Sequence, residues 1–313
     1  MQTHTFVVDD KSAQMRLDIF ITRLFPQYTR SFVSRLIKTD CVHINDHLNK
    51  KTSYQVKAGD RLTLVIPKME QPSDRPEAIP LDILYEDQDV VVINKQAGLV
   101  VHPAPGHANG TLVNALLHYN QKQFSQVERF GIVHRLDQDT TGCLIVAKNR
   151  QSQTILNQSF KDRTIEKKYC CLVSGQMDKE QGIIDFPIGR HPTNRKKMSI
   201  RARNNRNAET HWQVHSRFDH FSFLNVLLKT GRTHQIRVHL AAINHPVVGD
   251  RLYGNNRKWH NLKPDILKQL KQTNRQMLHA CQLGFTHPIR QQFMCVEAPL
   301  PEDMIQLIEL LKQ

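Results

Sequence analysis

Four prolines between Pro67 and Pro80 constrain the architecture of this chain more than any other feature. Proline fixes φ and lacks the amide hydrogen that helices and central strands need, so this density favours an extended, semi-stiff tether. A chain of 313 residues is also long enough for two domains. We therefore expect a small domain over residues 1–66, a linker over 67–80 and a larger domain over 81–313.

The charge of the chain favours a polyanionic partner. Lys and Arg number 43 against 29 Asp and Glu, which gives a formal net charge of +14. An excess of this size is typical of proteins that bind nucleic acid. A membrane partner is not expected, because no strongly basic amphipathic helix and no apolar run of roughly 18 residues is present. Residues 1–10 also lack the pattern of a secretory signal.

The cysteines and histidines indicate neither a metal site nor a disulfide framework. None of the six cysteines forms a C-x-x-C pair, and no histidines form an H-E-x-x-H pattern. Reduced thiols in a cytoplasmic protein are the expectation. The glycine-rich loops that hold dinucleotides or nucleoside triphosphates are also missing, so no such cofactor is expected.

Residues 14–66 have the pattern of a small α/β module. Apolar residues recur at helical spacing over 17–25, and a second short helix is expected over 31–38. Residues 41–45 alternate as a strand before an Asn-Asp turn, and residues 61–66 read as a closing strand.

The basic residues of this module are candidates for contact with RNA. They include Arg30, Arg35 and Lys38, although a net charge of +4 (ten basic, six acidic) over residues 1–66 also fits a solvated surface. The stretches TRSFVSRLIKTDCVHIN and VKAGDRL resemble the S4 RNA-binding module. Asp40 and Asp46 stand where that family usually has glycine.

Residues 81–313 mix strands and helices without a strict alternation. Apolar runs over 90–94 and 144–147 predict buried strands, residues 221–229 alternate as another strand, and residues 304–311 repeat as a terminal helix. We expect an α+β fold with a mixed, largely antiparallel sheet.

Two carboxylates lie between an apolar run and the strand over 144–147. Asp137 either caps a turn or acts as a carboxylate at a strand end in a cleft, and residue type alone favours the first. Asp139 precedes two threonines and a glycine, so a turn cap explains it better.

A strand, a turn and a helix are expected over residues 227–243. Arg237 borders the buried stripe of this helix, so its guanidinium should lie at the edge of the core, whereas Arg232 lies on the turn. A partly buried arginine needs a carboxylate partner and holds that partner ionised. A structural salt bridge or a solvated arginine is the alternative. Tyr169, at the start of an expected strand, reads by residue type as a core residue.

Residues 190–206 carry seven Lys or Arg residues and no acid, among them Arg195, Lys196 and Lys197. The segment is either a solvated loop without structure of its own or a loop that tracks phosphates.

Four longer motifs resemble the RNA pseudouridine synthase family that joins an S4 module to an RluA-type catalytic domain. They are PLDILYEDQDVVVINKQAGLVVHP, HRLDQDTTG, KTGRTHQIRVHLAAINHPVVGD and LHACQLGFTHP, and the resemblance covers nearly the whole chain. The stretches GTLVNALLHY, RHPTNRKKM and MIQLIELL resemble the RluD branch. That branch modifies large-subunit (23S) ribosomal RNA, which implies clustered uridines in one stem-loop of the helix 69 type.

The resemblance implies roles for four residues. Asp137 corresponds to the catalytic Asp, and Arg237 to the Arg paired with it. Tyr169 corresponds to the Tyr that stacks on the target base and can help remove its C5 proton. Arg135 corresponds to the Arg that enters the space vacated by the flipped base. Arg30, Arg35, Lys38, Arg195, Lys196, Lys197 and Arg232 remain as further candidates for RNA binding.

The implied reaction breaks the N1–C1′ bond of uridine, turns the uracil and joins C5 to C1′. Nothing is oxidised and no group is imported, so no cofactor and no metal is expected. An ionised carboxylate attacks C1′ or removes the C2′ proton, and the sequence leaves both routes open. The uridine must leave its stack to reach the carboxylate.

Two competing hypotheses remain. A non-catalytic S4-type RNA-binding or ribosome-associated protein is disfavoured by the presence of all four residues to which the family gives roles. An S4-linked methyltransferase is disfavoured by the missing cofactor loop. The departures Gln96, where the family has proline, and Thr141, where many members have Ser, carry no assigned chemistry. We expect a monomer that acts on ribosomal RNA or its precursor particle.

Overall fold

The computed structural model describes residues 2–25, 30–66, 75–103, 107–194, 196–254 and 262–313. The chain divides into two compact units, Met1–Gln71 and Pro72–Gln313. Each unit has a hydrophobic core of its own. Arg195 and residues 67–74 of the expected linker lie outside the described residues.

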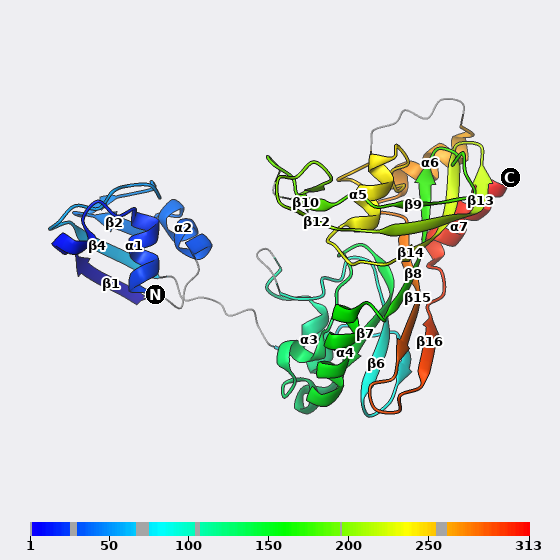
Figure 1. Ribbon diagram of the computed structural model, residues 1–313, viewed down its shortest axis with the longest axis horizontal. Coiled ribbons are helices and arrows are strands. Elements are labelled where there is room, and N and C mark those ends of the chain that lie inside the picture. Colours follow the sequence, from blue (N-terminus) through cyan, green and yellow to red (C-terminus); the bar gives the residue numbers. More distant parts are fainter. Residues whose placement is uncertain (1, 26–29, 67–74, 104–106, 195, 255–261) are drawn as a thin grey trace. The chain divides into compact units, whose positions relative to one another are not determined.

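The smaller unit packs two helices on a four-stranded antiparallel sheet with the order β1-β4-β2-β3 (Figure 1). Its elements are β1 (Gln2–Val7), a 3₁₀ turn (Asp10–Ser12), α1 (Leu17–Leu24), α2 (Arg30–Lys38), β2 (Val42–Ile44), β3 (His47–Leu48) and β4 (Arg61–Ile66). The expected helices, strands and turn are confirmed. Asn45 and Asp46 have φ values of +49° and +64°, as a tight hairpin turn requires.

The larger unit is built on a nine-stranded sheet within the described residues. Its order is β5-β6-β7-β15-β8-β14-β13-β9, with β16 paired to β15. The strands are β5 (Ile83–Glu86), β6 (Val90–Lys95), β7 (Thr141–Ala147), β8 (Glu166–Ser174), β9 (Gln181–Ile184), β13 (Thr210–Phe218), β14 (Phe221–Leu228), β15 (Leu278–Thr286) and β16 (Phe293–Glu297). The β7–β15 pair is parallel and the other pairs in this sheet are antiparallel, which confirms the expected mixed α+β fold.

Helices cover both faces of this sheet (Figure 1). They are α3 (Leu112–Phe124), α4 (Arg150–Asp162), α5 (Gln235–Ala242), α6 (Pro264–Gln272) and α7 (Glu302–Lys312), and a 3₁₀ turn spans Glu128–Gly131. Successive strand residues point to opposite faces, so Cys171 packs with residues of α3 and α5, whereas Cys170 and Leu172 pack with those of α6 and α7.

Residues 188–206, named here the basic arm, form a small sheet outside the main one. Its strands are β10 (Ile188–Arg190), β11 (Met198–Ser199) and β12 (Asn205–Arg206), in the order β11-β10-β12. The described part of this segment is therefore folded, and the interpretation as a loop without structure of its own is wrong.

The described part of the proline-rich segment, residues 75–80, packs against the larger unit. The side-chain amide of Asn114 donates to the carbonyl of Arg75 at 2.9 Å, and the Glu77 N–H donates to the Asn114 carbonyl at 3.0 Å. All six cysteines are free thiols. None of the helices in the described residues is both long and apolar enough to span a bilayer.

Candidate active site

Asp137 lies in the loop that leads into β7, in the middle of the sheet. Its backbone carbonyl accepts the Thr140 N–H at 3.1 Å, which closes a turn. The carboxylate of Asp139 makes no capping hydrogen bond with the described residues, so its expected role as a turn cap is wrong. Gly142 follows with φ of +108°, and a Cβ there would lie 2.2 Å from the carbonyl oxygen of Ala280 in β15. Glycine thus permits the parallel strand to approach the loop.

Lys95, at the end of β6, binds the same loop through its side chain. It is fully buried, and its Nζ donates to the carbonyls of Gln96, Leu99 and Gln138 at 2.8, 3.0 and 2.8 Å. Three acceptors match the three N–H groups of an ammonium, although burial lowers the pKa of Lys95 to about 7. Only the backbone carbonyl of Gln96 accepts from Lys95. This hydrogen bond therefore does not depend on whether residue 96 is glutamine or, as in the family, proline.

Arg237 of α5 joins Asp137 to a second carboxylate. Its Nη1 donates to Oδ2 of Asp137 at 2.9 Å, so the expected ion pair is present. Its Nε and Nη2 donate to Asp250 at 2.6 and 2.9 Å. The side chains of Asp250, Arg237 and Asp137 are 0%, 6% and 19% exposed. The Arg237–Asp250 pair is therefore buried, while the Asp137 side chain reaches solvent.

The two oxygens of the Asp137 carboxylate differ in their hydrogen bonding. Oδ2 is engaged by Arg237, whereas Oδ1 accepts no hydrogen bond from the described residues. Burial alone would raise the pKa of Asp250, but pairing with Arg237 lowers it below its usual value. Despite burial, the two carboxylates raise the pKa of Arg237, so the cation is permanent. The arrangement leaves one carboxylate oxygen free beside a fixed positive charge.

Asp137, Arg237 and Tyr169 line one cavity of about 530 Å³. It lies between the loop before β7, the end of α4, the start of β8 and the turn between β14 and α5. Its size falls within the range of sites for small molecules and cofactors, which is large enough for one nucleotide.

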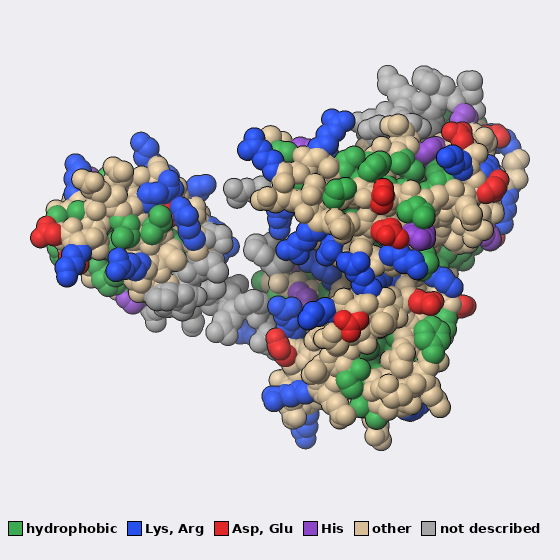
Figure 2. All heavy atoms as spheres, in the orientation of Figure 1, with side chains coloured by type: hydrophobic (Ala, Val, Ile, Leu, Met, Phe, Trp, Pro, Cys, Tyr) green, Lys and Arg blue, Asp and Glu red, His purple; other side chains and the backbone are tan. Residues whose placement is uncertain are grey.

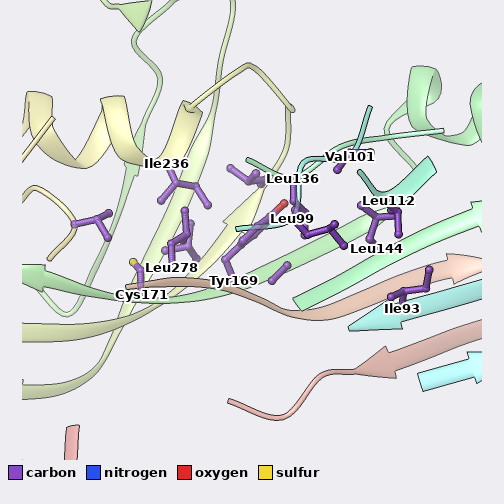
Figure 3. Packing of buried hydrophobic residues seen from close by; sticks show 14 of the residues in the cluster. Ile93, Leu99, Val101, Leu112, Leu136, Leu144, Tyr169, Cys171, Ile236 and Leu278 are labelled. Carbon is purple, nitrogen blue, oxygen red and sulfur yellow. The ribbon is translucent and has the colours of Figure 1, made fainter. Parts of the chain in front are cut away.

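Tyr169 forms part of the apolar side of this cavity. Its side chain is buried in the cluster that includes Leu136, Ile236 and Leu278 (Figure 3). Burial, and next the charge of Asp137, raise the pKa of Tyr169 well above its ordinary value, so the phenol is neutral. The sheet thus sets an aromatic ring and a carboxylate in the same cavity.

Two sequence profiles and many known proteins match this chain. The sequence profile described as RNA pseudouridylate synthase matches residues 89–242, and the S4 domain profile matches residues 15–62. An RNA pseudouridine synthase of Aquifex aeolicus is 43% identical over 292 residues, which cover 92% of this chain and 90% of the relative. The chain belongs to the RNA pseudouridine synthase family.

Other relatives of this synthase carry a more specific name. Proteins named ribosomal large subunit pseudouridine synthase D are 42% identical in Nitrosomonas europaea and 41% identical in Escherichia coli O157:H7. The alignments cover 99% and 98% of the synthase and 88% and 94% of those relatives. The solved structure of human RNA pseudouridylate synthase domain containing 1 matches with a TM-score of 0.57 at 26% identity, covering 75% of the synthase and 96% of that chain.

Cations gather at the mouth of the cavity of the synthase, and Figure 2 shows Lys and Arg side chains along a hollow that crosses the larger unit. Within the described residues none of the cations lining the mouth has an acidic partner; they are Arg135, Lys161, Arg163, Lys167 and Arg232. Burial, and next the charge of Arg163, lower the pKa of Lys167. Mutually repelling cations without a counter-charge make a binding place for an anion.

The remaining candidates for RNA contact are spread over both units. Arg30 donates twice to Asp18, at 2.9 and 2.8 Å, so its charge is partly neutralised within the small unit. Arg35 and Lys38 are exposed on α2. In the basic arm Lys196 is exposed, and Nζ of Lys197 lies 5.9 Å from the centre of the Tyr253 ring.

Sequence reasoning missed four residues of the site: Lys95, His234, Asp250 and Tyr253. Asp250 directly follows the apolar run Val247–Val248 and a glycine, which is the same signal that singled out Asp137. No comparable signal marks the other three.

Proposed function

We propose that this synthase isomerises uridines in large-subunit ribosomal RNA, clustered in one stem-loop of the helix 69 type, with Asp137 as the catalytic carboxylate. The names of the relatives support the class of RNA. The observation that carries the catalytic assignment is the Asp137 carboxylate, with Oδ2 bound to buried Arg237 and Oδ1 free in the cavity. A fixed cation thus lies beside a carboxylate from which water is partly excluded.

The flipped uridine enters the cavity with its base against Tyr169. Stacking on an aromatic ring contributes ~1–3 kcal/mol, which offsets part of the cost of leaving the stack. Oδ1 of Asp137 then attacks C1′ or removes the C2′ proton. Arg135, exposed at the mouth, occupies the space that the base has left. The reaction oxidises nothing and imports no group, so it requires no cofactor.

Residues 1–66 act as an RNA anchor, residues 67–80 as the linker and residues 81–313 as the catalytic domain. The S4 match over residues 15–62 supports the first of these roles. The six free thiols agree with a cytoplasmic enzyme. Arg232, Lys196, Lys197, Arg35 and Lys38 contact the RNA backbone in this proposal.

Release of tritium from RNA that carries C5-tritiated uridine tests the activity, because joining C5 to C1′ expels that proton. We expect release from large-subunit ribosomal RNA and loss of pseudouridine from one stem-loop in a deletion strain. RNA binding without release would favour the non-catalytic S4-type protein. Release with pseudouridines lost elsewhere would retain the enzyme and overturn its target.

Lys167 gives a test of the cationic mouth, with Lys168 as a matched control. The two residues are neighbours on β8, but Lys167 lines the cavity and Lys168 is exposed outside it. We expect Lys167→Gln to weaken RNA binding by about tenfold and to reduce the salt dependence of binding by about one ion. Lys168→Gln should change both less. Equal effects of the two variants on the slope of log K against log salt would contradict an anion site at the mouth.

Removal of residues 1–66 tests the RNA anchor. The deletion removes a net +4 and leaves +11 over residues 81–313, from 31 basic and 20 acidic residues, so the shortened enzyme should still bind RNA. Affinity should fall because a tethered second site no longer raises the local RNA concentration. The salt slope should flatten by about 0.7–0.9 for every phosphate that the shortened enzyme no longer binds, and site choice should loosen. Identical slopes and identical modified positions would show that the small unit is no anchor for this RNA.

A further inference from the structure

His234 lies beside Asp137 but has no part in the reaction described so far. It ends the turn before α5 with φ of +57°, a left-handed conformation that is uncommon for residues other than glycine. Backbone strain of this kind persists where the surroundings determine an unusual geometry. The side chain is 17% exposed and lines the same cavity as Asp137.

The hydroxyl of Tyr253 fixes the tautomer of His234. This hydroxyl accepts the Met198 N–H at 2.7 Å and lies 2.8 Å from Nδ1 of His234. The described residues offer the hydroxyl proton no other acceptor, so donating it to Nδ1 satisfies every donor. The imidazole proton then lies on Nε2, which is 3.9 Å from Oδ2 of Asp137. A neutral N–H donor thus faces the oxygen that Arg237 already holds.

Charges around the imidazole are balanced. Burial lowers the pKa of His234, and the charged groups that face it oppose or reinforce this effect in pairs: Asp137 and Asp250 raise the pKa, and Arg237 and Arg135 lower it. His234 is therefore neutral at pH 7. It approaches the carboxylate as a hydrogen-bond donor without adding a second cation beside Arg237.

Tyr253 also connects the site to the basic arm. Met198, whose N–H it accepts, belongs to β11 and follows directly after Lys196 and Lys197. The centre of the Tyr253 ring lies 5.9 Å from Nζ of Lys197 and 5.2 Å from Cζ of Arg237. One tyrosine thus contacts the cationic arm, the imidazole and the guanidinium that binds Asp137.

We propose that His234 is a positioning residue for Asp137, and that Tyr253 couples it to the seating of RNA phosphates on the basic arm. The inference rests on the proposed catalytic role of Asp137. Hydrogen bonds at active sites are often long before substrate binds and shorten in the complex. Closure by about 1 Å brings Nε2 to a normal hydrogen-bond distance from Oδ2. Oδ2 is then held from two sides, which directs Oδ1 at the sugar.

Tyr253→Phe tests the coupling because it retains the ring and removes only the hydroxyl. We expect the single-turnover rate with saturating enzyme to fall about tenfold, because an imidazole without this hydroxyl no longer directs its Nε2 hydrogen at the charged Asp137 carboxylate. The Kd for RNA should change less than about twofold, since the cationic arm remains. The acidic limb of the pH–rate profile should move to higher pH, because Nδ1 loses the donor that competes with protonation and the pKa of His234 rises.

Two substitutions at His234 separate positioning from folding. Asn tolerates the left-handed backbone, but its amide is too short to reach Asp137, whereas Gln extends a donor farther. We expect His234→Asn to lose about tenfold in single-turnover rate and His234→Gln to recover part of that loss. Thermal unfolding of both variants identifies any effect of misfolding. Equal rates for the two, with equal unfolding temperatures, would contradict a donor role.

Asp137→Asn in the same assay distinguishes the possible failures. Wild-type turnover by that variant would overturn the catalytic role of Asp137 and this inference with it. An inactive Asp137→Asn beside wild-type rates and unshifted pH profiles for Tyr253→Phe and His234→Asn would overturn this inference alone. Weaker RNA binding by Tyr253→Phe with an unchanged single-turnover rate would also overturn it, because the tyrosine would then serve binding only.

Discussion

Asp137→Asn should abolish isomerisation and leave RNA affinity within about twofold of wild type, since phosphate contacts dominate binding. The amide has the shape of the carboxylate, and its single oxygen can still accept from Arg237 in the position that Oδ2 occupies in the wild type. It lacks the charge with which Oδ1 would attack C1′ or remove the C2′ proton. Tritium release and filter binding on the same RNA measure the two quantities. Turnover by this variant above trace level would exclude Asp137 as the catalytic carboxylate.

Asp139→Asn is the matched control, two residues along the same loop. Its side chain does not line the cavity, and its carbonyl, which accepts from Arg275 at 3.3 Å, is unchanged by the substitution. This variant should retain most of the activity. If both variants were equally inactive, the charge of the loop as a whole would matter rather than one carboxylate.

Local patterns in the sequence predict the elements that carry the site. The strands around residues 90–94 and 144–147 are buried on both sides, so short apolar runs identify them. The helix that bears Arg237 follows from its buried stripe. The sequence does not predict strand β1, because the half-buried residues of the strand are His4 and Phe6, and a histidine on that face breaks the alternation of apolar and polar side chains that marks a half-buried strand.

Contacts between distant parts of the chain account for most of what the sequence does not reveal. Arg237 and Asp137 are 100 residues apart, and Lys95 and Gln138 are 43 apart. Their meeting depends on the order β6-β7-β15-β8-β14, in which β15 lies between β7 and β8 although it is the last of these five strands along the chain. Residue type alone does not specify that order. The Arg237–Asp137 pair was expected only because the resemblance to the family implies it.

The contact between Arg237 and Asp250 is another that the sequence does not reveal, and it matters more for stability. Arg237 was expected to serve one carboxylate, and it serves two, of which the unexpected one is fully buried. A buried charge that loses its partner is among the most damaging changes in a protein. Arg237 therefore has a structural role that is separate from its contact with Asp137.

Arg237→Met should consequently reduce both activity and stability. Stability should fall by ~3–5 kcal/mol, because Asp250 is left as an unpaired buried charge. Activity of the folded fraction should also fall, because Asp137 loses the guanidinium that holds its Oδ2. Arg232→Met should do neither to the same extent, since Arg232 is partly exposed and its side chain, among the described residues, donates only to the Asn207 carbonyl. Denaturant unfolding and single-turnover rates of both variants provide the comparison.

The double variant Arg237→Met/Asp250→Asn separates the two roles of Arg237. Removing the buried charge should restore much of the lost stability, while activity stays low because Asp137 remains without its partner. The pH dependence supplies a second check. In the wild type the pKa of Asp250 is lowered in the folded state, so its stabilising contribution is present above the unfolded pKa and is lost as pH falls through the folded value. The stability difference between wild type and Arg237→Met should thus shrink toward acidic pH. A difference that stays constant as pH falls from 7 to below the ordinary pKa of an aspartate, or activity restored together with stability in the double variant, would contradict this division of roles.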